Sequence, residues 1–307
     1  MQESDIEELL RQNIDMVCDE EESMLIVGKQ VRNAQLGRSD LTAIDNEGDI
    51  VLIEIKRDRR DIESRRESFE FQAIRYAASY ATIREVDDLV NKVYAPYIEK
   101  YRHEFKGEAE SLTSAELAAR KLTEFLAENN AKEFNSKQKI ILVASDFDEQ
   151  TLSAVAWLNK NGVSISCYKL IPYKLNGETF MNIEKILPAS DYDDYFVDLL
   201  HSSSPLSKRT KGAVTRRNLP RINDMLEWGV VKAGDVIQAR GRDSEGTLLS
   251  NGNILVDERE LSLALWLKGV YGWSSVQTYA FSVHKESGKT LSQIREEYME
   301  HQAFQME

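Results

Sequence analysis

The chain has 307 residues, 42% of them hydrophobic and 30% charged, a length that accommodates about two domains with buried cores. Its net charge of −13, taken alone, argues against a nucleic-acid partner, and no apolar run approaches the roughly 20 residues that cross a bilayer. The acidic start lacks the basic and then apolar order of a signal peptide, so we expect a cytoplasmic protein that contacts no membrane.

The first half of the chain alternates helices with strands. Apolar residues at helical spacing predict a helix over about 4–18, and the run 24–31 predicts a strand. Residues 39–45 and 49–56 flank an Asn-Glu-Gly turn and predict a hairpin. We expect a long helix over about 61–83, then a helical region interrupted by Pro96. A capping box at Thr113 predicts a further helix to about residue 129.

The second half continues the pattern and then changes composition. Residues 139–145 and 163–170 predict strands, with a helix between them that ends near Gly162. From residue 201 to 222 no acidic residue occurs, and the basic residues there are Lys208, Arg209, Lys211, Arg216, Arg217 and Arg221. This basic strip either follows a phosphate backbone or is a solvated linker. A small α/β segment begins near Leu219.

Chemistry concentrates in the predicted hairpin. Side chains alternate along a strand, so Glu54 and Lys56 share one face. A three-residue loop pairs Asp45 with Asp49 and places Asp40 directly across from Glu54. Two carboxylates roughly 5 Å apart repel unless one is protonated or a cation lies between them. Two alternatives stay open, because a bare Glu-x-Lys is more often a surface ion pair and a register slip would turn Asp40 away.

The arrangement suits phosphodiester hydrolysis. Mg²⁺ prefers oxygen ligands, and a bound ion polarises the scissile phosphate and lowers the pKa of a bound water. Lys56 can orient that water or neutralise charge in the transition state. Two cysteines and four scattered histidines offer neither zinc-ligand spacing nor a catalytic triad.

These residues resemble the PD-(D/E)XK nuclease superfamily, and within it the RecB-like and mismatch-endonuclease (NucS/EndoMS) types. The run from Gly37 to Asp40 matches the family's aspartate, and Glu54-Ile55-Lys56 matches its Glu-x-Lys strand. The N-terminal helix resembles the family's first helix, whose glutamate completes the acidic cluster. The resemblance assigns that role to Glu7, with Glu8 as second choice, and implies Mg²⁺ held by Glu7, Asp40 and Glu54, with Mn²⁺ as a substitute.

Gln72 and Tyr76 match the Gln-x-x-x-Tyr signature of the RecB-like branch. Residues four apart share a helix face, so both can serve one site. The resemblance covers roughly the first 190 residues, with the helical stretch 86–135 as an insertion.

The C-terminal segment resembles RAMA-type domains, which are appended to restriction-like proteins and proposed to recognise DNA. The resemblance rests on residues 220–241, a helix over 261–267, Tyr271-Gly272-Trp273 and residues 287–291. An aromatic ring on a reading surface can stack on a base, which favours Tyr271 and Trp273, although tryptophans of a small domain are somewhat more often core residues.

We therefore expect an α/β fold with a mixed central sheet flanked by helices, restriction-endonuclease-like, and a second, small α/β domain. Its parts are a nuclease domain (1–198), a basic linker (199–217) and a RAMA-like DNA-reading domain (218–307). The expected function is Mg²⁺-dependent hydrolysis of DNA, including modified DNA, in restriction, defence or repair. A non-catalytic DNA-binding or scaffold protein and an RNA-directed nuclease are the alternatives, and a homodimer is allowed. The expected nucleic-acid contacts are Arg38, the basic strip, Tyr271 and Trp273.

Overall fold

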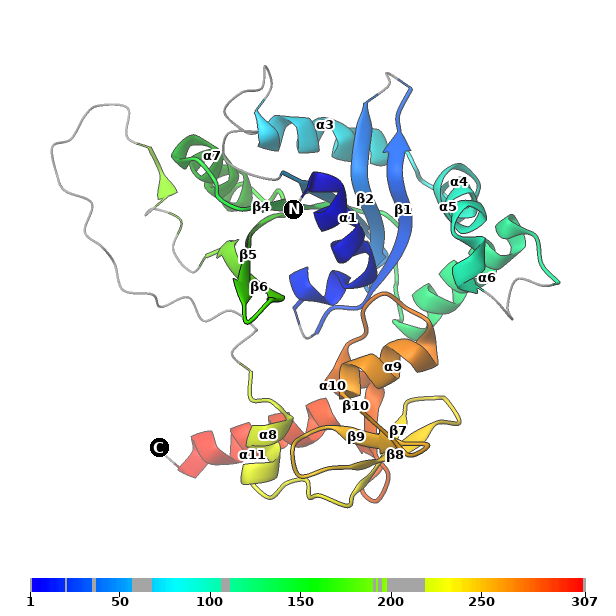
Figure 1. The fold of residues 1–307 in the computed structure, drawn as a ribbon, viewed down its shortest axis with the longest axis vertical. Helices are drawn as coiled ribbons and strands as arrows, with labels where there is room; N and C mark the ends of the chain where they lie inside the picture. Colours follow the sequence, from blue (N-terminus) through cyan, green and yellow to red (C-terminus); the bar gives the residue numbers. More distant parts are fainter. Residues whose placement is uncertain are drawn as a thin grey trace, which may run out of the picture. The chain divides into compact units, whose positions relative to one another are not determined.

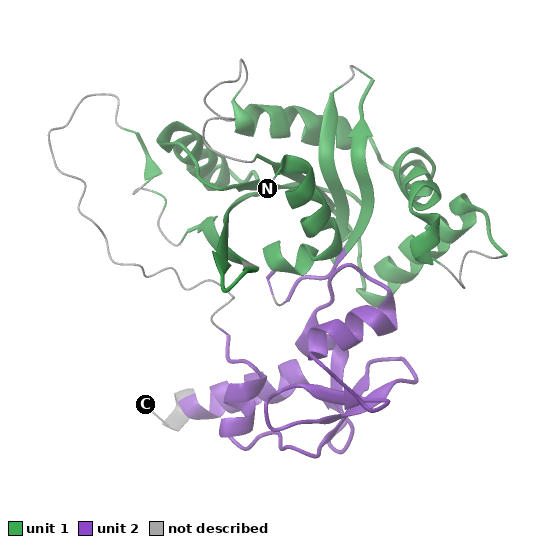
Figure 2. Cartoon of the chain, in the orientation of Figure 1, with its two compact units in different colours: residues 1–17, 25–214 green, residues 18–24, 215–307 purple. Residues whose placement is uncertain are grey.

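The computed structural model describes residues 2–19, 21–34, 37–56, 68–105, 111–189, 192, 195–197 and 219–305. Two compact units divide the chain, as Figure 2 shows. Unit 1 comprises residues 1–17 and 25–214, and unit 2 comprises residues 18–24 and 215–307. No helix among the described residues is both long and apolar enough to cross a lipid bilayer.

Unit 1 is built on a six-stranded mixed sheet in the order β1-β2-β3-β4-β5-β6 (Figure 1). Its strands are β1 (Met24–Arg32), β2 (Arg38–Asp45), β3 (Ile50–Ile55), β4 (Gln138–Ala144), β5 (Ile165–Leu175) and β6 (Glu178–Leu187). β2 pairs antiparallel with β3, β4 runs parallel to both β3 and β5, and β6 returns antiparallel. The predicted α/β class with a mixed central sheet is confirmed.

Helices pack against this sheet because their apolar faces match its buried strands. α1 (Glu3–Gln12) contacts β2 and β3, while α3 (Phe69–Tyr80) contacts β2, β3 and β4, and α7 (Glu149–Lys160) contacts β5 and β6. Every residue of β3 is buried, so this central strand is covered on both faces. Glu54 is therefore a carboxyl group inside a hydrophobic core, at 1% exposure.

The region predicted as an insertion consists of short helices that pack on one another. They are α4 (Val86–Leu89), the π-helical turn η2 (Val90–Tyr94), α5 (Ala95–Lys100), the 3₁₀ turn η3 (Arg102–Phe105) and α6 (Ser114–Glu128). The regular α-helix is interrupted just before Pro96, as predicted: the π turn η2 separates α4 from α5, and Pro96 lies in the first turn of α5, although the chain stays helical throughout. The capping box is confirmed, since Thr113 Oγ1 accepts from Glu116 N at 3.2 Å.

Two other predicted boundaries change. α1 stops at Gln12, since Asn13 leaves the helical conformation and its Nδ2 donates to Leu9 O, and a separate 3₁₀ turn, η1 (Ile14–Val17), follows. The predicted helix 61–83 is present as α3 from Phe69 and ends at Tyr80. Its expected first turns lie outside the described residues.

Unit 2 holds a second six-stranded sheet of short antiparallel strands, ordered β10-β9-β8-β7-β11-β12, with four helices among the described residues. The strands are β7 (Val236–Ala239), β8 (Glu245–Leu248), β9 (Ile254–Val256), β10 (Arg259–Leu261), β11 (Ser282–His284) and β12 (Lys289–Thr290). The helices are α8 (Ile222–Glu227), α9 (Leu263–Tyr271), α10 (Thr278–Phe281) and α11 (Leu291–Gln305).

Residues 18–24 join unit 2 through specific hydrogen bonds. Met24 and Ser275 exchange two backbone bonds, and Gln277 N donates to Ser23 Oγ at 3.0 Å. Arg295, at 1% exposure, places Nη2 3.4 Å from Glu21 Oε1. A segment near the N-terminus is therefore structurally part of the C-terminal unit.

Candidate metal and catalytic site

Asp40 and Glu54 lie on neighbouring strands, where the turn between β2 and β3 fixes their register. Asp45 N donates to Asp49 O at 3.0 Å, and the ladder continues with Leu41 opposite Ile53. The predicted three-residue loop and register are therefore confirmed. At the open end of the hairpin, Asp40 N donates to Glu54 Oε1 at 3.4 Å.

Asp40 is held by the backbone of β3. Ile55 N donates to Asp40 Oδ2 at 2.8 Å, which fixes one carboxylate oxygen and offsets part of the cost of burying the charge. Asp40 remains 8% exposed and Glu54 only 1%, so Asp40 is the more accessible of the two.

Glu7 enters the same region from α1. The amphipathic helix turns Glu7 inward with Ile6 and Leu10, and Glu7 is only 3% exposed. Its Oε2 accepts a hydrogen bond from Gln30 Nε2 at 2.8 Å, and the charge of Asp40 is close enough to affect its pKa. Within the described part of the chain, Glu7 Oε1 and Glu54 Oε2 are buried and have no hydrogen-bond partner.

Burial dominates the electrostatics of these carboxyl groups. It raises the pKa of Glu54 to about 9, with repulsion from Asp40 adding to the rise and Lys56 opposing it. Burial also raises the pKa of Asp40 and of Glu7. A desolvated carboxyl group favours its neutral form unless a cation compensates, so all three carboxyl groups are ionised near neutral pH only with a cation beside them.

Lys56 extends the β3 backbone beyond the last strand residue. Its N–H donates to Val143 O on β4, and its Nζ donates to Ile55 O at 2.8 Å. The ammonium lies 3.7 Å from Glu3 Oε1 and 5.2 Å from the centroid of the Phe69 ring, and the side chain is 2% exposed. The charge of Lys56 lowers the pKa of both Asp40 and Glu54, so it lies in the same electrostatic environment.

A metal ion fits the ligand chemistry of Glu7, Asp40 and Glu54, since all three offer carboxylate oxygen and two of them have an unpartnered buried oxygen. Their ligand atoms are more widely spaced than those of one other cluster. In the described parts of the chain, only Asp45, Glu47 and Asp49 form a group of three whose ligand atoms all lie within 4.8 Å of one another. Coordination by the predicted trio would thus need a closer approach of its side chains.

The Asp45 cluster has its own explanation. Lys139 Nζ lies 2.6 Å from Asp45 Oδ2 and 2.8 Å from Glu47 Oε2, so a lysine already compensates these charges. Asp45 Oδ1 also accepts from Glu47 N and Asp49 N, which closes the β2–β3 turn. The group of Asp45, Glu47 and Asp49 is therefore explained by the β2–β3 turn and by the ion pairs with Lys139.

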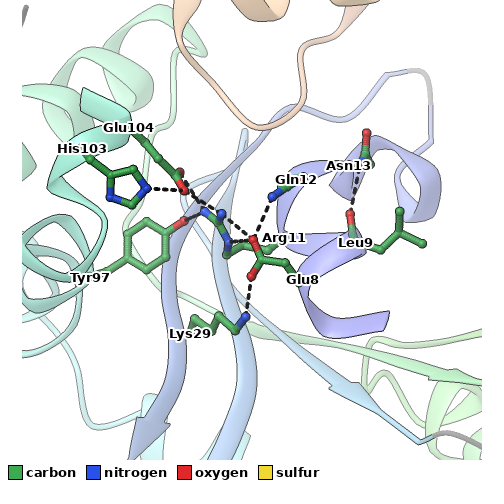
Figure 3. A network of polar contacts seen from close by, with 9 residues as sticks. All are labelled: Glu8, Leu9, Arg11, Gln12, Asn13, Lys29, Tyr97, His103 and Glu104. Atoms are coloured by element: carbon green, nitrogen blue, oxygen red, sulfur yellow. Dashed lines mark hydrogen bonds and ion pairs between the residues drawn. The ribbon is translucent and has the colours of Figure 1, made fainter. Parts of the chain in front are cut away.

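A partly exposed network of hydrogen bonds and ion pairs around the buried Arg11 anchors α1 (Figure 3). Arg11 Nη1 donates to Tyr97 OH and Glu104 Oε2, each at 2.9 Å, and Arg11 Nη2 donates to Glu8 Oε1 and Glu104 Oε1 at 2.6 and 2.8 Å. Glu8 Oε2 pairs with Lys29 Nζ of β1 at 2.6 Å. The helical stretch 86–135 therefore holds α1, the helix that carries the candidate metal ligand Glu7.

This network also separates Glu7 from Glu8. Hydrogen bonds and ion pairs with Arg11 and Lys29 lower the pKa of Glu8 to about 2, which commits that carboxylate to structural pairing. Glu7 keeps an unpartnered oxygen. The geometry favours Glu7 over the second choice, Glu8.

Gln72 and Tyr76 meet on α3, as their spacing predicts, and Tyr76 contacts the start of β2. Gln72 Nε2 and Arg38 N both donate to Tyr76 OH, at 3.2 and 3.1 Å. A Cβ at Gly37 would lie 2.6 Å from Tyr76 Cε1, so only glycine allows this close approach. Tyr76 therefore holds the backbone of Arg38, two residues before Asp40.

The expected nucleic-acid contacts are divided among several regions. Arg38 is exposed at the start of β2, and its charge lowers the pKa of Glu7 and Asp40. Arg221 is exposed directly before α8 in unit 2. The other members of the basic strip lie outside the described residues: Lys208, Arg209, Lys211, Arg216 and Arg217.

Tyr271 and Trp273 were expected on an exposed surface that contacts DNA. This expectation is wrong, because both side chains are buried, at 6% and 5% exposure. Their ring centroids are 4.8 Å apart, and both rings pack edge-on against Phe281. Gly272, between the two residues, adopts the left-handed conformation that ends α9. The alternative that these aromatics are core residues describes them better.

Sequence reasoning missed the polar groups around Glu7. Gln30 donates to its carboxylate, and Lys29 lowers its pKa. Both interrupt the apolar run of β1, and this interruption was the available signal. Gln30 also has a φ of 56°, an uncommon conformation for a residue other than glycine.

No protein-family model matches this chain, and no curated protein matches it.

Proposed function

We propose that this chain is a metal-dependent nuclease that hydrolyses phosphodiester bonds of DNA. The observation that carries the proposal is the group of buried ionisable residues Glu7, Asp40, Glu54 and Lys56, in which two carboxylate oxygens lack any hydrogen-bond partner among the described residues. Such a group is costly to bury, and a divalent cation would compensate it. Strongly perturbed carboxyl groups concentrate at functional sites.

Each residue has a role in this reaction. Glu7, Asp40 and Glu54 would hold Mg²⁺, or Mn²⁺ in its place, and the ion supplies charge stabilisation for the scissile phosphate and a more acidic water. The Ile55 N–H keeps Asp40 oriented toward the site. Lys56, at the end of β3, would place positive charge near the reacting phosphate or the water that attacks it.

The fold is consistent with a restriction-endonuclease-like arrangement, which stays part of the proposal. A mixed sheet presents the two carboxylates from adjacent strands, and α1 supplies the third. Rigid strands suit this chemistry because they hold reacting groups in position. Unit 2, with exposed Arg221, would contribute binding to DNA, including modified DNA.

The experiment is a cleavage assay with Mg²⁺ and with Mn²⁺. The panel holds duplex, single-stranded, mismatched and methylated DNA of one sequence, together with the matching RNA, and EDTA serves as the control. We expect metal-dependent cleavage of DNA. Cleavage of RNA alone would establish the RNA-directed alternative, whereas binding of DNA without cleavage under both metals would favour the scaffold alternative.

A further inference from the structure

A large cavity lies beside the candidate site, between the end of β1, the start of β2 and the outer face of α3. Its volume is about 870 Å³, within the range of small-molecule binding pockets and far larger than a single ion needs. Arg32, Arg75 and Lys92 supply cationic groups to its wall. The lining among the described residues includes no carboxylate, although the chain as a whole is acidic.

The cations differ in their surroundings. Lys92 forms an ion pair with Asp88 at 2.7 Å, and Arg75 also interacts with another group. Arg32 and Arg75 are exposed residues at the rim, on β1 and α3 respectively. Guanidinium groups bind phosphate with paired hydrogen bonds, so the two arginines are the groups best suited to an anion.

Tyr76 adds a hydrogen-bond donor to this wall. Its hydroxyl oxygen already accepts from Arg38 N and Gln72 Nε2, so its own proton remains to be donated. In the described part of the chain no acceptor takes this proton. An anionic oxygen inside the cavity would supply the acceptor.

The cavity adjoins the carboxylate cluster through β2. Ser39 of β2 lines the cavity. Tyr80 also lines it and shares hydrogen bonds with Ser39 Oγ at 2.9 Å and Thr42 Oγ1 at 2.6 Å. Burial and the nearby charge of Glu54 both raise the pKa of Tyr80, so the cavity lies close to the carboxylate cluster.

We propose that this cavity binds one nucleotide of the substrate strand next to the scissile phosphodiester, with the nucleotide's phosphate at Arg32 and Arg75. The inference rests on the proposed nuclease function. Apolar side chains such as Val31, Ile83 and Val93 provide a surface for the sugar and base, and the cationic rim faces the phosphate. The cavity thus adds a substrate-positioning subsite to the carboxylate cluster.

The test measures binding of thymidine 5′-monophosphate to the full chain by calorimetry in EDTA, with thymidine and inorganic phosphate as comparison ligands. We expect the monophosphate to bind most tightly. The double variant Arg32→Gln/Arg75→Gln should weaken it at least about tenfold, since two charge-assisted contacts are lost. The matched control Arg120→Gln, at an exposed position of α6, should leave binding unchanged.

The outcomes separate the subsite from the nuclease activity. Equal binding of thymidine and its monophosphate, or equal binding by the double variant and wild type, would overturn the phosphate assignment. Inorganic phosphate as tight as the monophosphate would overturn the nucleotide assignment. DNA cleavage by the double variant with an unchanged KM would refute the subsite and leave the nuclease proposal intact. Monophosphate binding by a protein that cuts no nucleic acid would refute the nuclease proposal alone.

Discussion

Replacing Glu54 with glutamine should change how the stability of the metal-free protein depends on pH. Burial and the nearby Asp40 raise the pKa of Glu54 to about 9, whereas the unfolded chain keeps the ordinary value of 4.5. Between these values the folded protein binds a proton that the unfolded chain has released. The contribution of Glu54 to the free energy of unfolding should therefore be highest below the lower pKa and fall as the pH rises toward about 9.

The slope follows from a single proton. One proton bound only by the folded state changes the free energy of unfolding by about 1.4 kcal/mol per pH unit. From about pH 5.5 to about pH 8.5 the wild-type protein should lose about 4 kcal/mol from this group. Asp40 acts in the same direction, because burial also raises its pKa. Glutamine keeps the shape of Glu54 but cannot ionise, so its contribution to the slope disappears.

The assay is urea unfolding across this pH range in EDTA, for wild type, Glu54→Gln and a matched control, Glu47→Gln. Glu47 lies at the other end of the same hairpin and its side chain is 66% exposed. The control should follow the wild-type slope, and saturating Mg²⁺ should stabilise the wild type most at high pH. Identical slopes for Glu54→Gln and wild type would refute the reasoning, because Glu54 would then not carry the extra proton.

Three further perturbations follow from the contacts. Arg11→Met should lower the free energy of unfolding in urea by about 1–3 kcal/mol, since it breaks a partly exposed network. The control Lys92→Met removes one surface ion pair and should lower it by under about 0.5 kcal/mol. Equal losses in the two variants would contradict the role of the network. Trp273→Ala should leave a cavity in the core of unit 2 and destabilise it by about 3–5 kcal/mol. A variant that stays stable but binds DNA more weakly would instead support a role of Trp273 in contacting DNA. The third perturbation neutralises three arginines of the basic strip together, by Arg216→Gln, Arg217→Gln and Arg221→Gln. It should flatten the salt dependence of DNA binding. An unchanged slope of affinity against salt concentration would mean that the strip is only a linker.

The hairpin that carries the candidate site was the most predictable part of the chain. Alternation placed Glu54 and Lys56, and an Asn-Glu-Gly turn fixed the register that brings Asp40 to Glu54. These are local rules, and the contacts they govern join residues about 15 positions apart or fewer. The residue types and the local geometry therefore both indicate β2 and β3 as the strands that carry the candidate site.

One local signal was available and missed. Asn176 and Gly177 have φ of 52° and 86°, the conformation of a tight hairpin turn, and they join β5 to β6. An Asn-Gly pair between two strands is a strong hairpin signal, so the length of β5 and the presence of β6 could have been predicted.

Other features depend on contacts between distant residues. The assignment of residues 18–24 to unit 2 depends on Ser275 and Gln277, more than 250 positions away. Nothing local distinguishes this segment from the helix before it or the strand after it. The anchoring of α1 by Glu104 and the inward packing of Trp273 are of the same kind, since tertiary packing alone decides them.

The central claim is that buried Glu54 and Lys56 act in metal-dependent cleavage of DNA, and single-turnover cleavage with Mg²⁺ tests it most directly. Wild type should cut, and the control Glu47→Gln should cut at the same rate. Glu54→Gln and Lys56→Met should each lose at least about a hundredfold in rate while still binding DNA, since each removes a group needed in the transition state. Cleavage by either variant at the wild-type rate, or no cleavage by wild type with Mg²⁺ or Mn²⁺, would contradict the account.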